Sequence, residues 1–351
     1  MAVSLKQKTV LFIAPKFYDY HKKIIDALEE LSFEVFFFEN KFFREDPMLN
    51  DNDFISWVKR RKHPNYKTDY QKQILTKIKD RTIDLFLCIG GFSITSGFVD
   101  ELKSMYPQMR CIAYFWDSFR IWDYRNLISS FNRVYTFDRS DARKYQLEYL
   151  PLFYYFGNTE HIPYQDRTID FLFVGSVGYY SLNRLSILKY FEQLSSKQKL
   201  NSLLWLYFPK ASGSIVKRGV NWLRRRSPGR YRGLLKLVGD YEKTCSFIKH
   251  EVIDSDTLPQ LIRQAKCIID IPVPGQIGLT MRTIETLASG AKLITTNQSI
   301  VEEPFYTPEF IRLIDEKQPA VDINFLQSDV NTKIDIEYLQ LRRWLTKLLD
   351  I

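Results

Sequence analysis

The chain has 351 residues, of which 45% are hydrophobic, 26% charged and 15% aromatic, and its formal net charge is +9. A chain of this length and composition can bury two apolar cores, which excludes a disordered or fibrous protein and predicts two domains. No apolar run reaches the roughly 18 residues that would cross a bilayer, and the N-terminus lacks a signal-peptide pattern, so we expect a cytoplasmic protein.

In the first half of the chain, apolar runs of strand length alternate with amphipathic helical segments. This alternation is the pattern of βαβ units and a parallel sheet. We expect a first helix at 20–31 and strands at 9–15, 33–39, 84–90, 111–117 and 133–138. Residues 1–150 therefore predict a doubly wound, Rossmann-like domain of five strands.

Residues 151–168 are rich in turn formers and lack helical periodicity, which is typical of an interdomain linker. A second series follows, with strands expected at 170–176, 203–209, 267–272 and 292–296 and helices at 183–194, 258–265 and 280–289. These elements predict a second doubly wound, Rossmann-like domain at 169–330, interrupted by a basic insertion at 211–250.

The end of the chain, 331–351, contains one apolar helical stripe over residues 334–349, which we expect to pack at the seam between the domains. In doubly wound sheets, ligands bind beyond the carboxyl ends of the strands. We therefore expect an α/β fold of two tandem domains whose functional cleft lies between the two sheets.

The most informative segment runs from Gly275 to Asn297, GQIGLTMRTIETLASGAKLITTN. It reads as a loop with glycines, a helix, a glycine C-cap and a buried strand. The free N–H groups and partial positive charge of a helix N-terminus suit phosphate oxygens, and Arg282 in the first turn adds a guanidinium for a diphosphate. Glu285 shares a helix face with Arg282 and can accept the two hydroxyls of a ribose. Alternatively, Arg282 and Glu285 form an ordinary surface pair.

This segment resembles the donor-site motif of GT-B glycosyltransferases. The closer likeness is to the capsular, exopolysaccharide and lipopolysaccharide biosynthesis group and to spore-maturation transferases, which carry Arg and Glu three apart before an Ala-x-Gly-like turn. The resemblance implies a bacterial hexosyltransferase that moves a sugar from a nucleotide-diphosphate donor to a glycan or lipid-linked acceptor. Large retaining families have a second glutamate eight positions before Glu285, where this chain has Ile277, so retention of configuration does not follow.

Donor-binding residues are expected in two places. Around the helix they are Gln276, Gly278, Thr280, Arg282 and Glu285. At the end of the strand 170–176, Gly175 and Ser176 let backbone amides approach a ligand, and Arg184 at the following helix start is placed for a phosphate. The likeness extends to a Gly-Ser pair followed by an arginine, although glycine turns after strands are also common for purely structural reasons.

The N-terminal domain offers polar residues at strand ends for the acceptor side. Asp117 is the candidate general base, because a partly buried carboxylate of raised pKa can accept the proton of an acceptor hydroxyl. For Asp138 we favour a helix N-cap over a catalytic role, and a lone histidine near a helix start is more often structural. The acceptor-side candidates are His21, Gly90, Gly91, Arg120 and Asp138.

Most of the net charge lies between residues 211 and 250, which contain ten lysines and arginines and only two acidic residues. Arginines interleaved with tryptophan and leucine fit an anionic membrane surface, and the candidates for that contact are Trp222, Arg224, Arg225, Arg226, Arg230 and Arg232. A solvated basic loop is the alternative. A nucleic-acid partner is not expected, because no known nucleic-acid-binding motif is present. We therefore expect a peripheral protein on the inner face of the cytoplasmic membrane.

No metal or other cofactor is expected, because the cysteines lack zinc-like spacing and no Asp-x-Asp motif stands in a suitable context. Catalysis would then depend on positioning and on stabilising the departing diphosphate. Two other functions stay open: a GT-B-shaped binding protein without catalysis, and a nucleotide-sugar epimerase.

Overall fold

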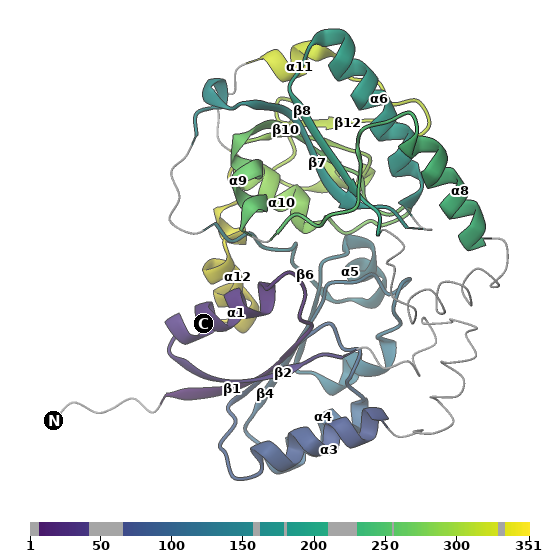
Figure 1. Cartoon of the computed structure of the whole chain (residues 1–351). Coiled ribbons are helices and arrows are strands. Elements are labelled where there is room, and N and C mark those ends of the chain that lie inside the picture. The colour runs from purple at the N-terminus through teal and green to yellow at the C-terminus, as the bar shows by residue number, and fades with distance from the viewer. Residues whose placement is uncertain are drawn as a thin grey trace. The chain divides into compact units, whose positions relative to one another are not determined.

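The computed structural model describes residues 7–41, 66–156, 162–178, 181–209, 230–254, 256–328 and 334–351. The chain divides into two compact units (Figure 1). Unit 1 comprises Met1–Tyr155 together with Tyr338–Ile351, and unit 2 comprises Phe156–Glu337.

Unit 1 contains a six-stranded parallel sheet in the order β2-β1-β3-β4-β5-β6. The strands are β1 (Lys8–Ala14), β2 (Phe33–Glu39), β3 (Leu85–Ile89), β4 (Arg110–Phe115), β5 (Arg133–Thr136) and β6 (Glu148–Tyr149). The first five confirm the predicted strands. The expected total of five was wrong, because β6 has only two residues and so carries no readable periodicity.

The helices of unit 1 cover both faces of this sheet, with α1 and α12 on one side and α3 and α4 on the other (Figure 1). They are α1 (Tyr20–Glu30), α3 (Tyr66–Ile78), α4 (Ser96–Met105), α5 (Arg139–Tyr145) and α12 (Leu341–Leu349), with the 3-10 turns η1 (Arg125–Ser130) and η5 (Glu337–Leu339). Because both faces are covered, all five residues of the central strand β3 are buried, which explains its continuous apolar run.

The C-terminal segment does not form one helix over 334–349, as the apolar stripe predicted. Gln340 has an extended backbone and caps α12, since its side chain accepts hydrogen bonds from two backbone N–H groups of the first turn. The helix belongs to unit 1. Trp344 is fully buried there, with its ring 4.8 Å from that of Tyr114, and its indole N–H donates to the carbonyl of Pro151 at 2.8 Å.

Unit 2 also contains a six-stranded parallel sheet, in the order β12-β11-β10-β7-β8-β9. The strands are β7 (Ile169–Ser176), β8 (Ser202–Tyr207), β9 (Ile248–Lys249), β10 (Ala265–Asp270), β11 (Lys292–Thr295) and β12 (Ile311–Leu313). The four predicted strands are present. The two that sequence reasoning missed, β9 and β12, are short and lie at the two edges of the sheet.

The sheet of unit 2 lies between α9 and α10 on one side and α6 and α8 on the other (Figure 1). The helices are α6 (Asn183–Gln198), α8 (Arg230–Glu242), α9 (Thr257–Gln264), α10 (Met281–Ala288) and α11 (Ile323–Gln327), with the 3-10 turns η2 (Tyr164–Asp166) and η4 (Gln298–Glu302).

A buried arginine ties three parts of unit 2 together. Arg167 is 3% exposed, and its guanidinium donates to the backbone carbonyls of Ile162, Ala265 and Ser289. Burial lowers the pKa of Arg167 to about 10, so the side chain stays charged at neutral pH. Each of its three nitrogens has a carbonyl partner, as a buried charge requires.

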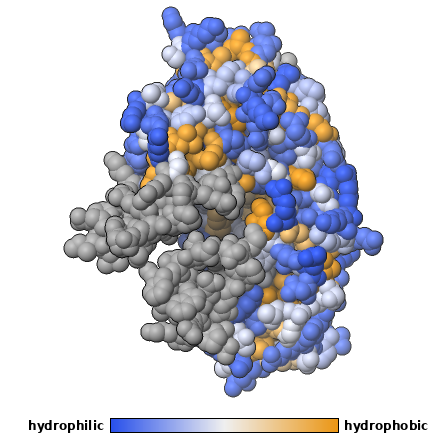
Figure 2. All heavy atoms as spheres, turned by 90° about the vertical axis from the view of Figure 1, so that its right-hand side faces the viewer, coloured by the Kyte–Doolittle hydropathy of each residue, from blue (hydrophilic) through white to orange (hydrophobic). Residues whose placement is uncertain are grey.

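On the face shown in Figure 2, the described residues are mainly hydrophilic, and apolar residues occur in small groups. Within the described ranges, no helix is both long enough and apolar enough to span a bilayer. The side chains of all six residues proposed to face a membrane lie outside the described part of the chain, although α8 begins at Arg230.

Candidate functional site

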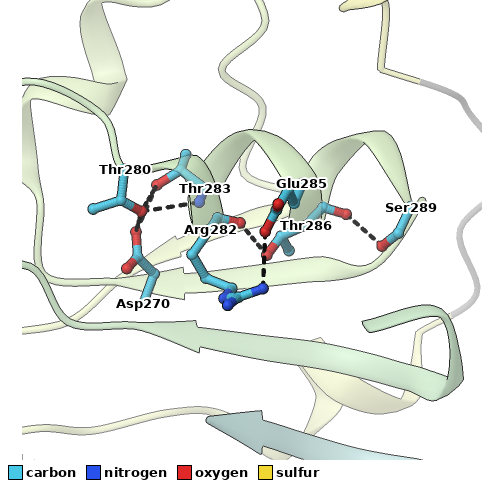
Figure 3. A network of polar contacts seen from close by, with 7 residues as sticks. All are labelled: Asp270, Thr280, Arg282, Thr283, Glu285, Thr286 and Ser289. Atoms are coloured by element: carbon cyan, nitrogen blue, oxygen red, sulfur yellow. Dashed lines mark hydrogen bonds and ion pairs between the residues drawn. The ribbon is translucent and has the colours of Figure 1, made fainter. Parts of the chain in front are cut away.

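The carboxyl end of β10 is joined to the start of α10 through one buried carboxylate. Oδ2 of Asp270, the last residue of β10, accepts hydrogen bonds from the hydroxyls of Thr280 at 2.7 Å and Thr283 at 2.6 Å (Figure 3). The Thr280 hydroxyl also accepts from the backbone N–H of Thr283 and so caps the helix. These contacts fix the helix N-terminus against the sheet.

The loop before α10 is fixed by side chains at the start of η4. The side-chain amide of Asn297 donates to the carbonyls of Ile277 at 3.1 Å and Gly278 at 3.4 Å, and the hydroxyl of Ser299 donates to Ile277 as well. Within the loop, the amide of Gln276 donates to the carbonyl of Gly278 at 3.1 Å. The loop therefore has one defined shape at the carboxyl edge of the sheet.

Arg282 and Glu285 pair with each other in the first turns of α10, at 2.9 Å between Nη1 and Oε2 (Figure 3). Their side chains are 17% and 11% exposed, so this is a mostly buried pair rather than the exposed surface pair of the alternative interpretation. Nε of Arg282 is buried and has no hydrogen-bond partner among the described residues. A buried charged donor without a hydrogen-bond partner costs free energy. An anion bound at this helix N-terminus would give Nε of Arg282 an acceptor.

Sequence reasoning missed Asp270, Thr283, Asn297 and Ser299. Asp270 is the last residue of β10 and Asn297 stands two residues after β11, and this position at a strand end is the signal that would have identified them, because strand-end polar residues gather at one edge of a parallel sheet. Nothing in the sequence indicates that Asp270 bonds two threonines ten and thirteen residues later.

Gly175, Ser176 and Arg184 lie at the neighbouring strand end, as expected. Arg184 donates from Nε to the carbonyl of Ile271 at 2.8 Å and from Nη1 to the carbonyl of Ser176 at 2.6 Å, and burial lowers its pKa. It thus joins the ends of β7 and β10. A Cβ at Gly175 would stand 2.8 Å from the ring of Phe173, so packing within the chain itself accounts for this glycine. Contact of Arg184 with a phosphate stays a prediction.

Asp117 follows β4 in unit 1 and is partly buried. Burial raises its pKa to about 6, and the nearby Tyr124 hydroxyl opposes this with a smaller lowering of the pKa. The ring of Tyr124 stacks on Phe115 at 4.1 Å, which fixes the hydroxyl. A carboxylate with a pKa close to the working pH has the property that a general base needs.

The loop after β3 requires glycine at both positions. Gly90 has φ +84° and Gly91 has φ +139°, and a Cβ at Gly90 would lie 2.7 Å from the side-chain nitrogen of Asn40. Asn40, which is 2% exposed, donates to the carbonyl of Ile89 and accepts from the N–H and hydroxyl of Ser93. This buried network fixes the loop at the carboxyl edge of the sheet.

The other acceptor-side candidates have local roles. Asp138 is 1% exposed and accepts from the N–H groups of Ser140 and Asp141, so the favoured interpretation as the N-cap of α5 agrees with the structure. His21 is buried against the ring of Phe37 at 5.2 Å, and burial lowers its pKa, which keeps it neutral near pH 7. Arg120 is exposed.

The structure thus brings two sets of predicted residues together, each within its own unit. In unit 2, the strand ends of β7 and β10 gather Gly175, Ser176, Arg184, Gln276, Gly278, Thr280, Arg282 and Glu285. In unit 1, Gly90, Gly91 and Asp117 follow the adjacent strands β3 and β4. In the described segments, no three His, Cys, Asp or Glu side chains are arranged to hold a metal ion.

No family model matches the sequence, and no curated protein matches it significantly. Solved structures match it along nearly its whole length. An α,α-trehalose 6-phosphate synthase from Burkholderia multivorans is 10% identical with a TM-score of 0.56, over 98% of this chain and 93% of that chain. A UDP-forming α,α-trehalose-phosphate synthase from Burkholderia vietnamiensis is 11% identical with a TM-score of 0.54, over 98% and 96%. At such identities the likeness shows the fold alone, and it confirms two tandem Rossmann-like domains of the GT-B type.

Proposed function

We propose that this chain is a glycosyltransferase that binds the diphosphate of a nucleotide sugar at the N-terminus of α10. The observation that carries the proposal is the mostly buried pair of Arg282 and Glu285 beside a helix N-terminus that Asp270 fixes at the carboxyl edge of a parallel sheet. Such edges are where doubly wound sheets bind ligands. An ordinary surface pair would be exposed, and its helix would lack hydrogen bonds like those from Thr280 and Thr283 to Asp270.

The chemistry of the pair fits the two halves of a nucleotide diphosphate. The guanidinium of Arg282 and the helix N-terminus stabilise negative charge, which grows on the diphosphate as the sugar leaves. The carboxylate of Glu285 accepts hydroxyl hydrogens, as a ribose would offer. Because the Arg282 guanidinium and the helix N-terminus supply positive charge at the leaving group, we propose that the reaction needs no metal ion.

On the acceptor side we propose that Asp117 is the general base. Its pKa of about 6 leaves it mostly ionised near pH 7 while keeping appreciable basicity. The acceptor we propose is a glycan or a lipid-linked saccharide of a bacterial surface polysaccharide, in agreement with the sequence resemblance. A lipid-linked acceptor would also give the basic segment at 211–250 a purpose, because anionic lipid attracts arginine and lysine.

The first experiment is donor binding, measured as thermal stabilisation of the whole chain by UDP-, GDP-, CMP- and dTDP-sugars. UDP-sugars come first, because the synthases of the same fold are UDP-forming. A donor at a hundred times its Kd stabilises the folded state by about 2.7 kcal/mol. Arg282→Ala and Glu285→Ala should remove this stabilisation. Arg342→Ala, an exposed arginine on α12 in unit 1, is the matched control and should retain it.

Equal stabilisation of wild type and both variants would overturn the donor site. Turnover then separates the functions, because a transferase needs an acceptor before a sugar product forms. A changed sugar nucleotide formed without any acceptor would identify an epimerase instead. Donor binding without turnover on a broad acceptor panel would identify a binding protein.

A further inference from the structure

One imidazole in unit 2 contacts the chain at two points that are far apart in the sequence. His250 directly follows β9, and its Nδ1 lies 2.8 Å from the carbonyl oxygen of Phe208, which directly follows β8. Its Nε2 lies 2.7 Å from Oε1 of Glu242, the last residue of α8. We call His250, Phe208 and Glu242 the imidazole clamp. Between Phe208 and Glu242 the sequence holds nine lysines and arginines and one acidic residue, so the clamp joins the two sequence ends of the stretch that carries most of the net charge.

Both partners of His250 are hydrogen-bond acceptors. A backbone carbonyl has no hydrogen to donate, and neither has an ionised carboxylate. A neutral imidazole carries one N–H group and can donate to one of these oxygens, whereas an imidazolium carries two and can donate to both. Carboxyl groups lose their proton at a lower pH than imidazoles do, so near neutral pH the proton between Glu242 and His250 belongs to the ring. The two contacts together therefore indicate a protonated His250.

The surroundings of the ring favour its positive charge. The C-terminus of α8 carries partial negative charge from its free carbonyl groups, and Glu242 adds a full negative charge at the same place. The side chain of His250 is 21% exposed and that of Glu242 is 48% exposed, so water screens their attraction only in part. A charge-assisted hydrogen bond to a carboxylate is also stronger than one between neutral groups.

The other charged groups near the clamp have contacts of their own. On α8, Lys243 pairs with Asp240 at 3.3 Å. On β9, the ammonium of Lys249 lies 5.6 Å from the centre of the Trp205 ring, and on α6 the carboxylate of Glu192 accepts hydrogen bonds from the turn between α8 and β9. Glu242 is therefore the carboxylate whose charge should govern the proton on His250. Further titratable side chains on the neighbouring segments are Lys189, Tyr207, Lys236, Tyr241, Cys245 and Glu251.

The clamp holds the last turn of α8, which has less apolar support than the middle of the helix. Leu234 is 8% exposed and Val238 is 1% exposed, and both belong to the core of unit 2. In the last turn, Asp240 and Glu242 are exposed, and Tyr241 packs against this core only in part. Loss of the clamp would therefore affect the end of α8 without unfolding the core.

We propose that the imidazole clamp senses pH: it fixes the end of α8 while His250 is protonated and releases Glu242 when the ring becomes neutral. A neutral ring that keeps its N–H on Nδ1 still donates to Phe208, but it then presents a lone pair to the carboxylate of Glu242. Because the folded chain favours the charged ring, the contribution of the clamp to stability is fully present below about pH 6.5, where an unperturbed histidine titrates. It is lost as the pH rises through the higher midpoint of the folded chain. This inference does not depend on the proposed transferase function.

The protonation of His250 is measured by an NMR titration from pH 5.5 to 9 of the whole chain, labelled with ¹³C at Cε1 of histidine. The His250→Gln variant identifies the signal, because it lacks that one histidine. His250 should titrate about one pH unit above the ordinary value of about 6.5. His21 is the internal reference, because burial lowers its pKa and it should titrate below that value.

Glu242→Gln should remove the pH dependence, because an amide can donate to a neutral ring as well as accept from a protonated one. The midpoint of His250 should then fall by about half a pH unit or more. Hydrogen exchange over residues 238–244, corrected for the intrinsic effect of pH, should show protection that decreases about threefold or more from pH 6 to pH 9 in the wild type. In Glu242→Gln this protection should stay constant. Asp240→Asn is the matched control, because it removes an acidic charge from the same turn, and it should behave as the wild type does.

A midpoint of His250 at or below about 6.5, or equal shifts of the midpoint in Glu242→Gln and Asp240→Asn, would overturn the clamp. A raised midpoint without any pH-dependent change in the protection of α8 would show a surface ion pair and overturn the pH-sensing role. Since none of these measurements involves a nucleotide sugar, their failure would leave the donor-site proposal unaffected.

Discussion

Nη1 of Arg282 lies 2.9 Å from Oε2 of Glu285 across one turn of α10, and neither side chain is more than 17% exposed. At this burial the two charges depend on each other, since removing one leaves the other without its partner in a region of low dielectric. The same two groups are those proposed to contact the donor. Stability and binding at this pair are therefore linked.

A single and a double variant of this pair should separate the two effects. Arg282→Met alone should destabilise the fold by about 3 kcal/mol, because Glu285 stays buried as a charge, whereas Arg282→Met combined with Glu285→Gln should recover most of the loss. Donor binding should fail in both variants. Urea unfolding and calorimetry measure the two quantities. Full donor affinity in the stable double variant would contradict the proposed role of the pair.

The rate of sugar transfer should depend on the ionisation of Asp117. Because burial raises its pKa to about 6, kcat/KM should be constant above pH 7 and fall about tenfold for each pH unit well below 6. Asp117→Asn should lower kcat by about 10²- to 10⁴-fold while donor binding is unchanged. Initial rates between pH 5 and 8.5 measure this, and an undiminished rate in Asp117→Asn would exclude the base.

The Asp117 carboxylate should also affect the stability of the fold. A rise in pH that increases the rate should lower this stability. The pKa of Asp117 is raised from 3.8 to about 6, so folding favours the neutral carboxyl group. Its contribution to the free energy of unfolding is fully present below pH 3.8 and is lost as the pH rises through 6. At pH 8, Asp117→Asn should therefore stabilise the fold by up to about 3 kcal/mol, and at pH 4 the gain should vanish. Denaturant unfolding at the two pH values is the control that separates this effect from loss of activity.

Asp270 should behave as a positioning residue for the donor helix. Asp270→Ala leaves the buried hydroxyl of Thr283 without this acceptor, which should cost about 1–3 kcal/mol of stability and weaken donor binding. Asp254→Ala is a matched control, because Asp254 accepts from the N–H and hydroxyl of Thr257 at the exposed start of α9. Asp254→Ala should lose less stability than Asp270→Ala and bind donor normally. Equal donor binding in the two variants would contradict the positioning role.

Arg167 should matter for folding and not for chemistry. Arg167→Met leaves three backbone carbonyls without their donor, and we expect a loss of about 3–5 kcal/mol in the free energy of unfolding. Arg263→Met, a partly exposed arginine on α9, should change it by less than about 0.5 kcal/mol. Urea unfolding of both variants measures the difference, and similar small losses would show that the carbonyls find other partners.

The basic segment at 211–250 should carry membrane binding. The whole chain should float with liposomes that contain phosphatidylserine, and charge reversal at Arg224, Arg225 and Arg226 should abolish flotation, because each charge contributes about 1 kcal/mol near the surface. Liposomes of phosphatidylcholine alone are the control. Flotation that survives charge reversal would instead indicate an apolar anchor or no specific role for the segment.

Much of the fold was predictable from local pattern. Strands such as β2 (Phe33–Glu39) and helices such as α1 begin where the apolar periodicity predicts, because burial on one or both faces imposes that periodicity directly. The edge strands β6, β9 and β12 escaped prediction, since two or three residues paired on one side need little apolar character. The stripe over 334–349 gave no indication of the break at Gln340.

The sequence by itself determined the two-domain α/β fold and the candidate donor helix, because alternating βαβ periodicity and the Arg282–Glu285 spacing are local features. Only the tertiary structure decided which partners these residues have. Asp270 bonds two threonines, Arg184 bonds backbone carbonyls, and Phe17 meets Trp116, each through contacts between residues distant in the chain. Such contacts depend on sheet order and on burial, and these are set by the packing of the whole unit.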